Sequence, residues 1–134
     1  MALAEEHLFS RLSGFAGITA LISSRIYPIK IPPNTTMPAL TYTRISGRRI
    51  ESLLGNSALC YARYQLDAWG RKYSDVKALA EQVRLCLEGY KGTLAGVIFY
   101  GVNYLGDQDL YEDDTEVFRV SMDFVVHHNE EQPA

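Results

Sequence analysis

The clearest pattern of apolar and polar positions along the chain spans residues 60–90. Its first part alternates with a period of two, which predicts a strand half-buried in a sheet. Beyond Gly70 the apolar residues recur at steps of three and four, which predicts an amphipathic helix with Ser74 as its N-cap. The apolar positions are Cys60, Ala62, Tyr64, Leu66 and Ala68 on the strand, and Val76, Leu79, Ala80, Val83, Cys86, Leu87 and Tyr90 on the helix. We expect these two elements to pack against each other.

Weaker patterns on either side predict the remaining elements. Residues 2–23 are expected to be helical, with an interruption at Gly14 and Gly17. Extended segments are expected over 25–31, 39–46, 97–104 and 118–126, and Pro28 confines the first of them to a sheet edge. Residues 47–57 and 106–116 are expected to connect strands. The resulting order, α-β-β-β-α-β-β, predicts an α+β fold in which helices pack on one face of an antiparallel sheet.

Length and composition narrow the class of protein. A chain of 134 residues is expected to form a single domain, 1–134, with a flexible polar tail over residues 128–134. A net charge of −3 provides no electrostatic attraction to nucleic acid or to a membrane surface. No apolar run approaches the roughly 18 residues of a membrane span, and the N-terminus lacks a signal-peptide pattern. We therefore expect synthesis in a reducing cytoplasm, with both cysteines as thiols.

The sequence contains no convincing catalytic, cofactor-binding or metal site. The acidic residues between positions 107 and 116 are hard-cation ligands by type, but their spacing is not that of a calcium loop, and a solvated turn is the favoured interpretation. His127 and His128 are adjacent on a predicted strand, so their side chains leave opposite faces and cannot share an ion. Neither a GxSxG elbow nor a glycine-rich phosphate loop is present.

Charge is instead gathered into two opposite clusters. The basic cluster consists of Arg44, Arg48 and Arg49, and the acidic cluster includes Asp109, Glu112, Asp113 and Asp114. Opposite patches on one small subunit suit a head-to-tail contact between copies, which closes into a ring when the rotation permits. The hypothesis is that the basic cluster of one copy faces the acidic cluster of the next.

Four apolar or aromatic residues have two interpretations each. Trp69 and Tyr61 lie on the strand face opposite the core, where they are either interface residues or are covered by the first helix. The pair Leu53-Leu54 lies in a glycine-flanked segment and is either a buried plug or a docking tip.

Several motifs, in this order and spacing, resemble those of the siphophage tail completion proteins, also called minor tail, tail terminator or head-to-tail joining proteins. They are RIYP at 25–28, P-x-L-x-Y-x-R-I-S at 38–46, QLDAW at 65–69, DLYEDDT at 109–115 and RVSMDF at 119–124. The resemblance runs from about residue 18 to residue 126, and related proteins occur in prophages and gene transfer agents. The Arg48-Arg49 segment and the histidine-containing C-terminus have no counterpart in it.

The resemblance implies a lambda-type terminator fold and a structural role without catalysis or cofactors. Proteins of this kind cap the tail tube as a hexameric ring, end its polymerisation and enable head-to-tail joining. The implied partners are further copies of the chain, the major tail tube protein and the head completion or connector (stopper) protein. The implied location is the head-proximal end of the virion tail, after assembly in the host bacterial cytoplasm. Leu53 and Leu54 are the candidates for docking to the tube or connector.

Two other classes of function remain open from the residues alone. One is a small metal- or ligand-binding enzyme subunit that uses the acidic residues at 107–116. The other is a cytoplasmic adaptor that binds peptides along the sheet edge formed by the Pro28 segment.

Overall fold

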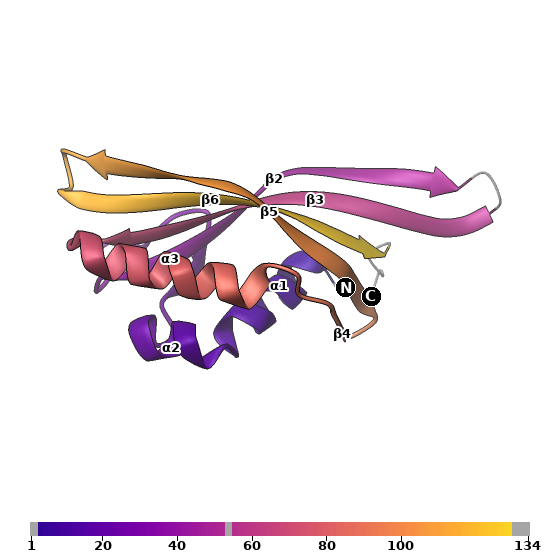
Figure 1. Ribbon diagram of the computed structural model, residues 1–134, viewed down its shortest axis with the longest axis horizontal. Helices are drawn as coiled ribbons and strands as arrows, with labels where there is room; N and C mark the ends of the chain where they lie inside the picture. Colours follow the sequence, from indigo (N-terminus) through magenta and orange to yellow (C-terminus); the bar gives the residue numbers. More distant parts are fainter. Residues whose placement is uncertain (1–2, 53–54, 130–134) are drawn as a thin grey trace.

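A computed structural model describes the backbone of residues 3–52 and 55–129, and the side chains of those residues outside positions 49–58. Within this part of the chain there are three helices and six strands (Figure 1). The elements are α1 (Ala4–Ser13), α2 (Ala16–Ile22), β1 (Ile26–Pro28), β2 (Ala39–Ser52), β3 (Gly55–Gly70), α3 (Tyr73–Leu87), β4 (Gly92–Leu94), β5 (Val97–Glu112) and β6 (Val117–Asn129). The predicted α+β class is confirmed.

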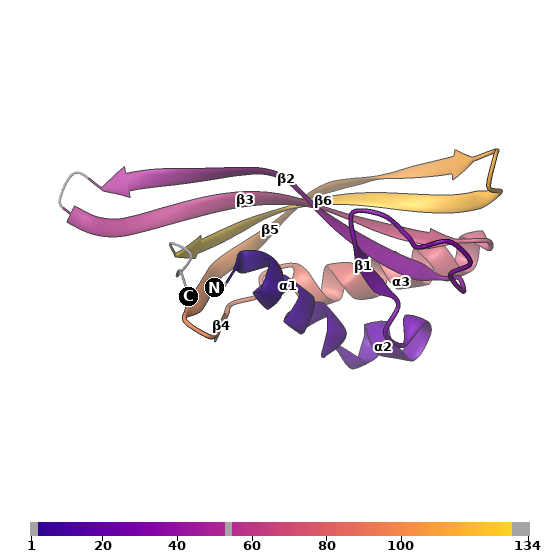
Figure 2. The ribbon, with the colours of Figure 1, turned by 180° about the vertical axis from the view of Figure 1, so that it is seen from behind.

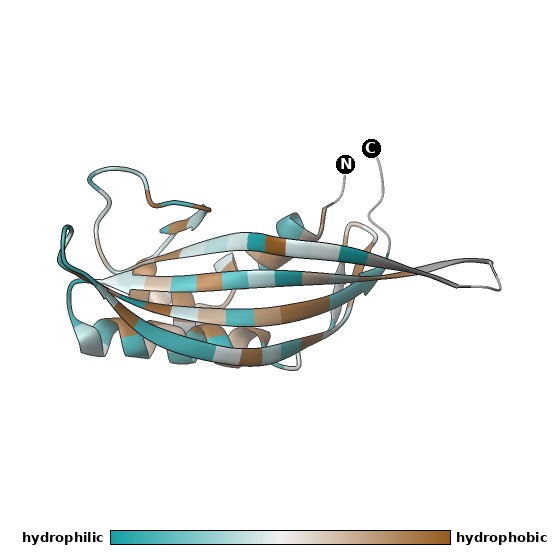
Figure 3. Ribbon diagram, turned by 90° about the horizontal axis from the view of Figure 1, so that it is seen from above, coloured by the Kyte–Doolittle hydropathy of each residue, from teal (hydrophilic) through white to brown (hydrophobic). Residues whose placement is uncertain are grey.

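The strands form one sheet in the order β1-β2-β3-β6-β5-β4. Every neighbouring pair is antiparallel except β1 and β2, which run parallel, so the sheet is mixed. Helices α1, α2 and α3 lie on the same side of the sheet in both opposite views (Figures 1 and 2). Seen from above, the long strands lie in front of the helices, and the opposite face of the sheet carries no helix (Figure 3).

The core lies between the helices and the inner face of the sheet, which is the face turned toward them. The predicted strand alternation and helix stripe are both confirmed, because their apolar positions are buried there. From β3 these are Ala62, Tyr64, Leu66 and Ala68, and from α3 they are Val76, Leu79, Ala80, Val83, Cys86 and Leu87. The matching residues of β6 are Val120, Met122, Phe124 and Val126. Helix α3 begins at Tyr73, one residue before the expected cap at Ser74, with Lys72 in the capping position.

Both long connections predicted from the sequence were wrong in the same way. Most of the segment at 47–57 extends β2 and β3 into a long hairpin, in which Gly47 lies opposite Ala62 and Ser52 opposite Gly55. The acidic segment from residue 106 to Glu112 continues β5 along β6, and only residues 113–116 form a turn. In both places a partner strand satisfies the backbone hydrogen bonds, and this overrides the low strand propensity of charged and glycine residues.

Two smaller corrections concern the second half of the chain. Gly92 begins the short strand β4, which the sequence analysis did not predict. The polar tail expected from residue 128 does not begin there, because His128 and Asn129 complete β6. His128 is buried on the inner face, whereas the Tyr61 ring meets the ring of His127 edge-on at 4.6 Å on the outer face. The two histidines therefore leave opposite faces, as the sequence predicted. Residues 130–134 of the predicted tail lie outside the described residues.

One buried histidine joins α1 to the sheet. The ring of His7 stacks on that of Phe99 with centroids 4.0 Å apart, and its Nε2 lies 2.9 Å from the Tyr90 hydroxyl. Burial holds the pKa of His7 below its usual 6.5, and a smaller opposing contribution comes from the backbone at Val97. The neutral form of this histidine therefore suits the folded state.

Acidification is expected to destabilise the protein through His7. Because the pKa of His7 is lower in the folded chain, its contribution to stability is complete above the unfolded value of 6.5 and decreases as the pH falls below it. We expect the free energy of unfolding, measured with urea, to decrease from pH 7 to pH 5, and His7→Gln to reduce this slope. Equal slopes for the wild-type chain and His7→Gln would contradict the assignment.

Candidate functional site

The subunit is elongated, and its two long hairpins point to opposite ends of it. The β2–β3 hairpin extends to one end of the long axis and the β5–β6 turn lies at the other (Figure 1). The β3–β6 ladder reaches only from Gly70–Phe118 to Leu59–Asn129, while β2 and β3 continue pairing to Ser52 and Gly55. The end of the β2–β3 hairpin is therefore a two-stranded ribbon beyond the end of β6.

The predicted basic cluster lies on β2. Arg44 forms an ion pair with Glu5 of α1, with Nη1 and Oε1 3.2 Å apart. Arg48 is exposed and lies opposite Tyr61, farther toward the hairpin end. Arg49 is in β2 as well, but its side chain is outside the described residues. Of this cluster, the structure therefore describes one arginine held within the subunit and one exposed to solvent.

The predicted acidic cluster lies at the opposite end of the subunit. Asp109 accepts a 2.7 Å hydrogen bond from the Tyr73 hydroxyl, and one of its oxygens lies 3.2 Å from Nζ of Lys77. These two contacts hold the pKa of Asp109 below its usual value, the tyrosine hydrogen bond being the larger cause. Asp113 and Asp114 are exposed in the turn between β5 and β6. The structure thus separates Asp109, which joins β5 to α3, from two carboxylates that face solvent.

Glu112 belongs to the outer face of the sheet, which the helices leave uncovered. Its carboxylate lies 3.9 Å from Nη1 of Arg119. The Arg119 guanidinium lies over the Trp69 ring, 5.0 Å from its centre, and the indole nitrogen donates a 3.0 Å hydrogen bond to Thr41. Trp69 is therefore not covered by the first helix, which packs on the other face of the sheet (Figure 2). The interface interpretation of Trp69 stays a prediction.

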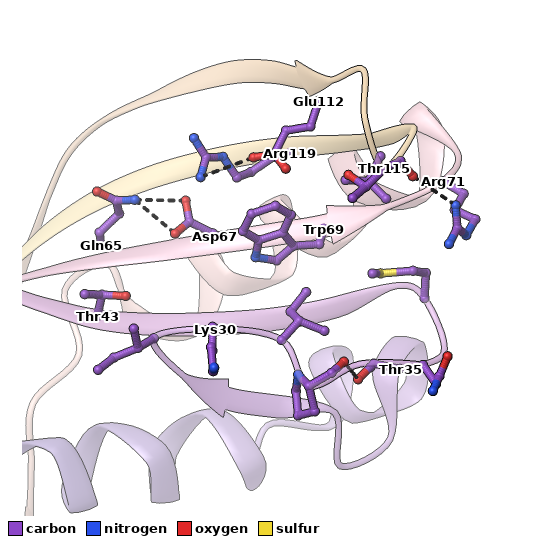
Figure 4. A pocket seen from close by; sticks show the side chains of 16 residues that line it. Lys30, Thr35, Thr43, Gln65, Asp67, Trp69, Arg71, Glu112, Thr115 and Arg119 are labelled. Carbon is purple, nitrogen blue, oxygen red and sulfur yellow. Dashed lines mark hydrogen bonds and ion pairs between the residues drawn. The ribbon is translucent and has the colours of Figure 1, made fainter.

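A hollow of about 600 Å³ lies beside this group, between the outer face and the segment that follows β1 (Figure 4). Its walls include Lys30 and Arg71 as well as Trp69. Asp67 also lines it, yet only 4% of this residue is exposed, and the amide of Gln65 donates to both of its carboxylate oxygens at 3.2 and 3.0 Å. Sequence reasoning missed this hollow. Alternation did place Gln65 and Asp67 on the outer face, but it carries no information about the segment that packs beside them.

No group of three or more histidine, cysteine, aspartate or glutamate residues in the described part of the chain is arranged to hold a metal ion. Burial raises the pKa of the Cys86 thiol to about 11, which opposes formation of a reactive thiolate. None of the helices described is both long enough and apolar enough to cross a membrane.

The candidate docking residues Leu53 and Leu54 lie outside the described residues. Their neighbours in sequence, Ser52 and Gly55, face each other as the last described pair of the β2–β3 hairpin.

Comparison with known proteins identifies relatives of the sequence and of the fold. The family model for tail completion protein gp17 matches residues 6–128. No curated protein sequence matches the chain. Among solved structures, a chain of the "Virion of native gene transfer agent (GTA) particle" is similar, with a TM-score of 0.72 and 15% sequence identity. The match covers 92% of each chain, and at this identity it is evidence of a shared fold.

Proposed function

Because the chain belongs to the tail completion protein gp17 family, it is a structural protein of the virion tail, and we propose that it caps the finished tail tube as a ring. The ring is expected to contain six copies, to end polymerisation of the tube and to present the surface that joins the tail to the head. In this proposal, assembly takes place in the host bacterial cytoplasm and the product remains at the head-proximal end of the tail.

The observation that carries the proposal is the separation of opposite charges along an elongated subunit. Exposed Arg48 lies toward the β2–β3 end, and exposed Asp113 and Asp114 lie at the β5–β6 end. A contact between two different surfaces of one chain is heterologous, and repetition of such a contact closes a ring when the rotation is suitable. Opposite charge on the two surfaces favours this contact over contacts between identical ends.

The β2–β3 hairpin is the part of the subunit that we assign to partners beyond the ring. We assign the β2–β3 hairpin to docking on the major tail tube protein or on the head completion (connector) protein, with Leu53 and Leu54 as the apolar contact. A ribbon that extends beyond the sheet gains stability from such a partner, because an isolated two-stranded hairpin is marginally stable in water.

The proposal contains no catalytic step, since interfaces alone account for the role. The alternative of an enzyme subunit with a metal or ligand at residues 107–116 gains no support, because Asp109 and Glu112 are engaged by Lys77, Tyr73 and Arg119. The family match provides no support for the alternative of a peptide-binding adaptor.

Removal of the gene is the direct test of the proposed function. Without the chain, tail tubes are expected to grow beyond their normal length and to remain without heads, which electron microscopy measures. Supplying the chain in trans should restore both properties. Tails of uniform normal length that join heads in the absence of the chain would overturn the proposal.

Charge reversal tests the contact between copies. The double variant Arg48→Glu with Arg49→Glu is expected to weaken association by about tenfold, because each exposed ion pair contributes about 0.2–1 kcal/mol. Association of the variant should also be less salt-dependent, since the attraction that salt screens is gone. Light scattering at low and moderate salt measures both effects. The control Lys72→Glu with Lys91→Glu changes the net charge equally at two other exposed lysines and should associate like wild type.

Replacing both candidate docking residues tests the role of the hairpin connection. Leu53→Ser with Leu54→Ser is expected to leave the circular dichroism spectrum and self-association of the protein unchanged while reducing the number of tails that carry heads. Counting joined particles by electron microscopy measures the loss. Normal tail length together with normal head joining would contradict the docking assignment.

A further inference from the structure

Both sides of the sheet have long stretches of open edge. On one side, β1 pairs only with residues 40–42 of β2, so residues 43–52 have no described strand beside them. On the other side, β4 pairs with residues 97–99 of β5, and the Gly89 N–H donates a 2.9 Å hydrogen bond to the Val102 carbonyl. Residues 103–112 of β5 therefore have no described strand beside them. Each stretch presents backbone N–H and C=O groups that point away from the sheet, which is the usual template for adding a strand.

Large apolar side chains lie exposed along these two stretches. Ile45 of β2 is 49% exposed, and on β5 Tyr111 is 49% and Leu105 is 52% exposed. Edge strands of monomeric proteins are normally protected by charges or prolines without such residues. Exposure of apolar side chains beside unpaired backbone groups indicates that these edges are covered in the assembled state.

The two edges carry opposite charge, and this selects what covers them. The β2 edge contains exposed Arg48, together with Arg44, which is paired with Glu5. The β5 edge contains exposed Asp107, together with Asp109 and Glu112, which are paired with Lys77 and Arg119. An edge that met its own counterpart would bring like charges together, while β2 against β5 brings opposite charges together. The partner that fits each edge is therefore the other edge of a second copy of this chain.

We propose that the open edge of β2 in one copy pairs with the open edge of β5 in the next, so that the sheets of successive copies join. This inference rests on the proposed ring and states how its subunits are held. Strands β2, β3, β6 and β5 alternate in direction within the subunit, so continuing the sheet in the same sense makes the new pair antiparallel. Cross-strand pairs along it supply the contacts.

The lengths of the open stretches determine the overlap. Ten residues of β2, 43–52, match the ten of β5, 103–112, in length. Antiparallel overlap with Arg44 opposite Glu112 brings residues 44–48 of one copy alongside residues 108–112 of the other, and Ile45 opposite Tyr111. Strand β1 limits the pairing at one end and the contact of Gly89 with Val102 limits it at the other, because each occupies the adjoining part of its own edge.

Irregularities in the ladders limit the pairing of these edges with other strands. The register of β2 shifts between Arg44 and Ser46, and that of β5 shifts between Tyr104 and Gly106. A β-bulge bends and twists the edge, so a regular foreign strand does not match it over its whole length.

A matched pair of variants tests the edge contact. Ile45→Asp places a carboxylate on the β2 edge, whereas Leu85→Asp makes the same kind of change on α3, at a leucine that is 51% exposed against 49% for Ile45. Each variant is produced in place of the wild-type chain, and its incorporation into purified tails is measured. We expect at least a tenfold loss for Ile45→Asp and wild-type incorporation for Leu85→Asp. Equal incorporation of the two variants would overturn the inference.

Backbone hydrogen exchange distinguishes a shared ladder from a contact of side chains alone. Exchange is measured by mass spectrometry on the free wild-type chain and on the same chain in purified tails. Residues 43–48 and 105–112 are expected to exchange at least tenfold more slowly in the tails, while residues 97–99, already paired with β4, serve as the internal control. If each edge exchanged at the same rate in the free chain and in the tails, the proposed ladder would be overturned.

These outcomes are separate from those that decide the proposed function. Loss of edge protection in tails that have normal length and carry heads would reject the ladder and leave the capping function standing. Uniform tails in the absence of the gene would reject the capping function whatever the exchange measurements show.

Discussion

Burial of the apolar stripe of α3 against the inner face of β3 and β6 is the interaction on which the structure depends. Val76, Leu79 and Val83 are fully buried against a sheet face that contributes Tyr64 and Phe124, both also fully buried. At about 25 cal/mol per Å² of apolar surface, such burial is the main term that opposes the loss of chain entropy. Because this packing uses one face of the sheet, it leaves the other face and both edges for contacts with partners.

The subunit is elongated because its central strands are long. Strands β2 and β3 continue past the end of β6, and β5 and β6 turn at the opposite end of the molecule (Figure 1). Arg48 lies on the side of the molecule toward the β2–β3 hairpin, and Asp113 and Asp114 lie at the β5–β6 end. Head-to-tail assembly needs two different surfaces on one chain, and this geometry separates them.

The comparisons agree with a role that depends on surfaces. A family of tail completion proteins matches nearly the whole chain, and a chain of a gene transfer agent virion shares its fold at 15% identity. At that identity the match is evidence of a shared fold and says nothing of individual surface residues. The contacts proposed for Arg48, Ile45 and Tyr111 are therefore derived from this chain's own edges and charges.

The sequence by itself determined the elements whose side chains decide burial. The period of two around Tyr64 and Leu66, and the steps of three and four from Val76 to Leu87, predicted a strand and a helix that pack together, and the structure confirms both. Local periodicity is sufficient there, because burial of every second residue stabilises a strand and burial at steps of three and four stabilises a helix.

Only the tertiary structure decided where the strands end and which surfaces stay open. Gly47 and Asp109 lie in segments with weak strand propensity, and they are strand residues because β3 and β6 supply backbone partners from elsewhere in the chain. The ion pairs of Arg44 with Glu5 and of Asp109 with Lys77, and the hollow beside Asp67, likewise join segments distant in sequence. Contacts of this kind leave no period in the sequence, because each depends on how whole elements pack.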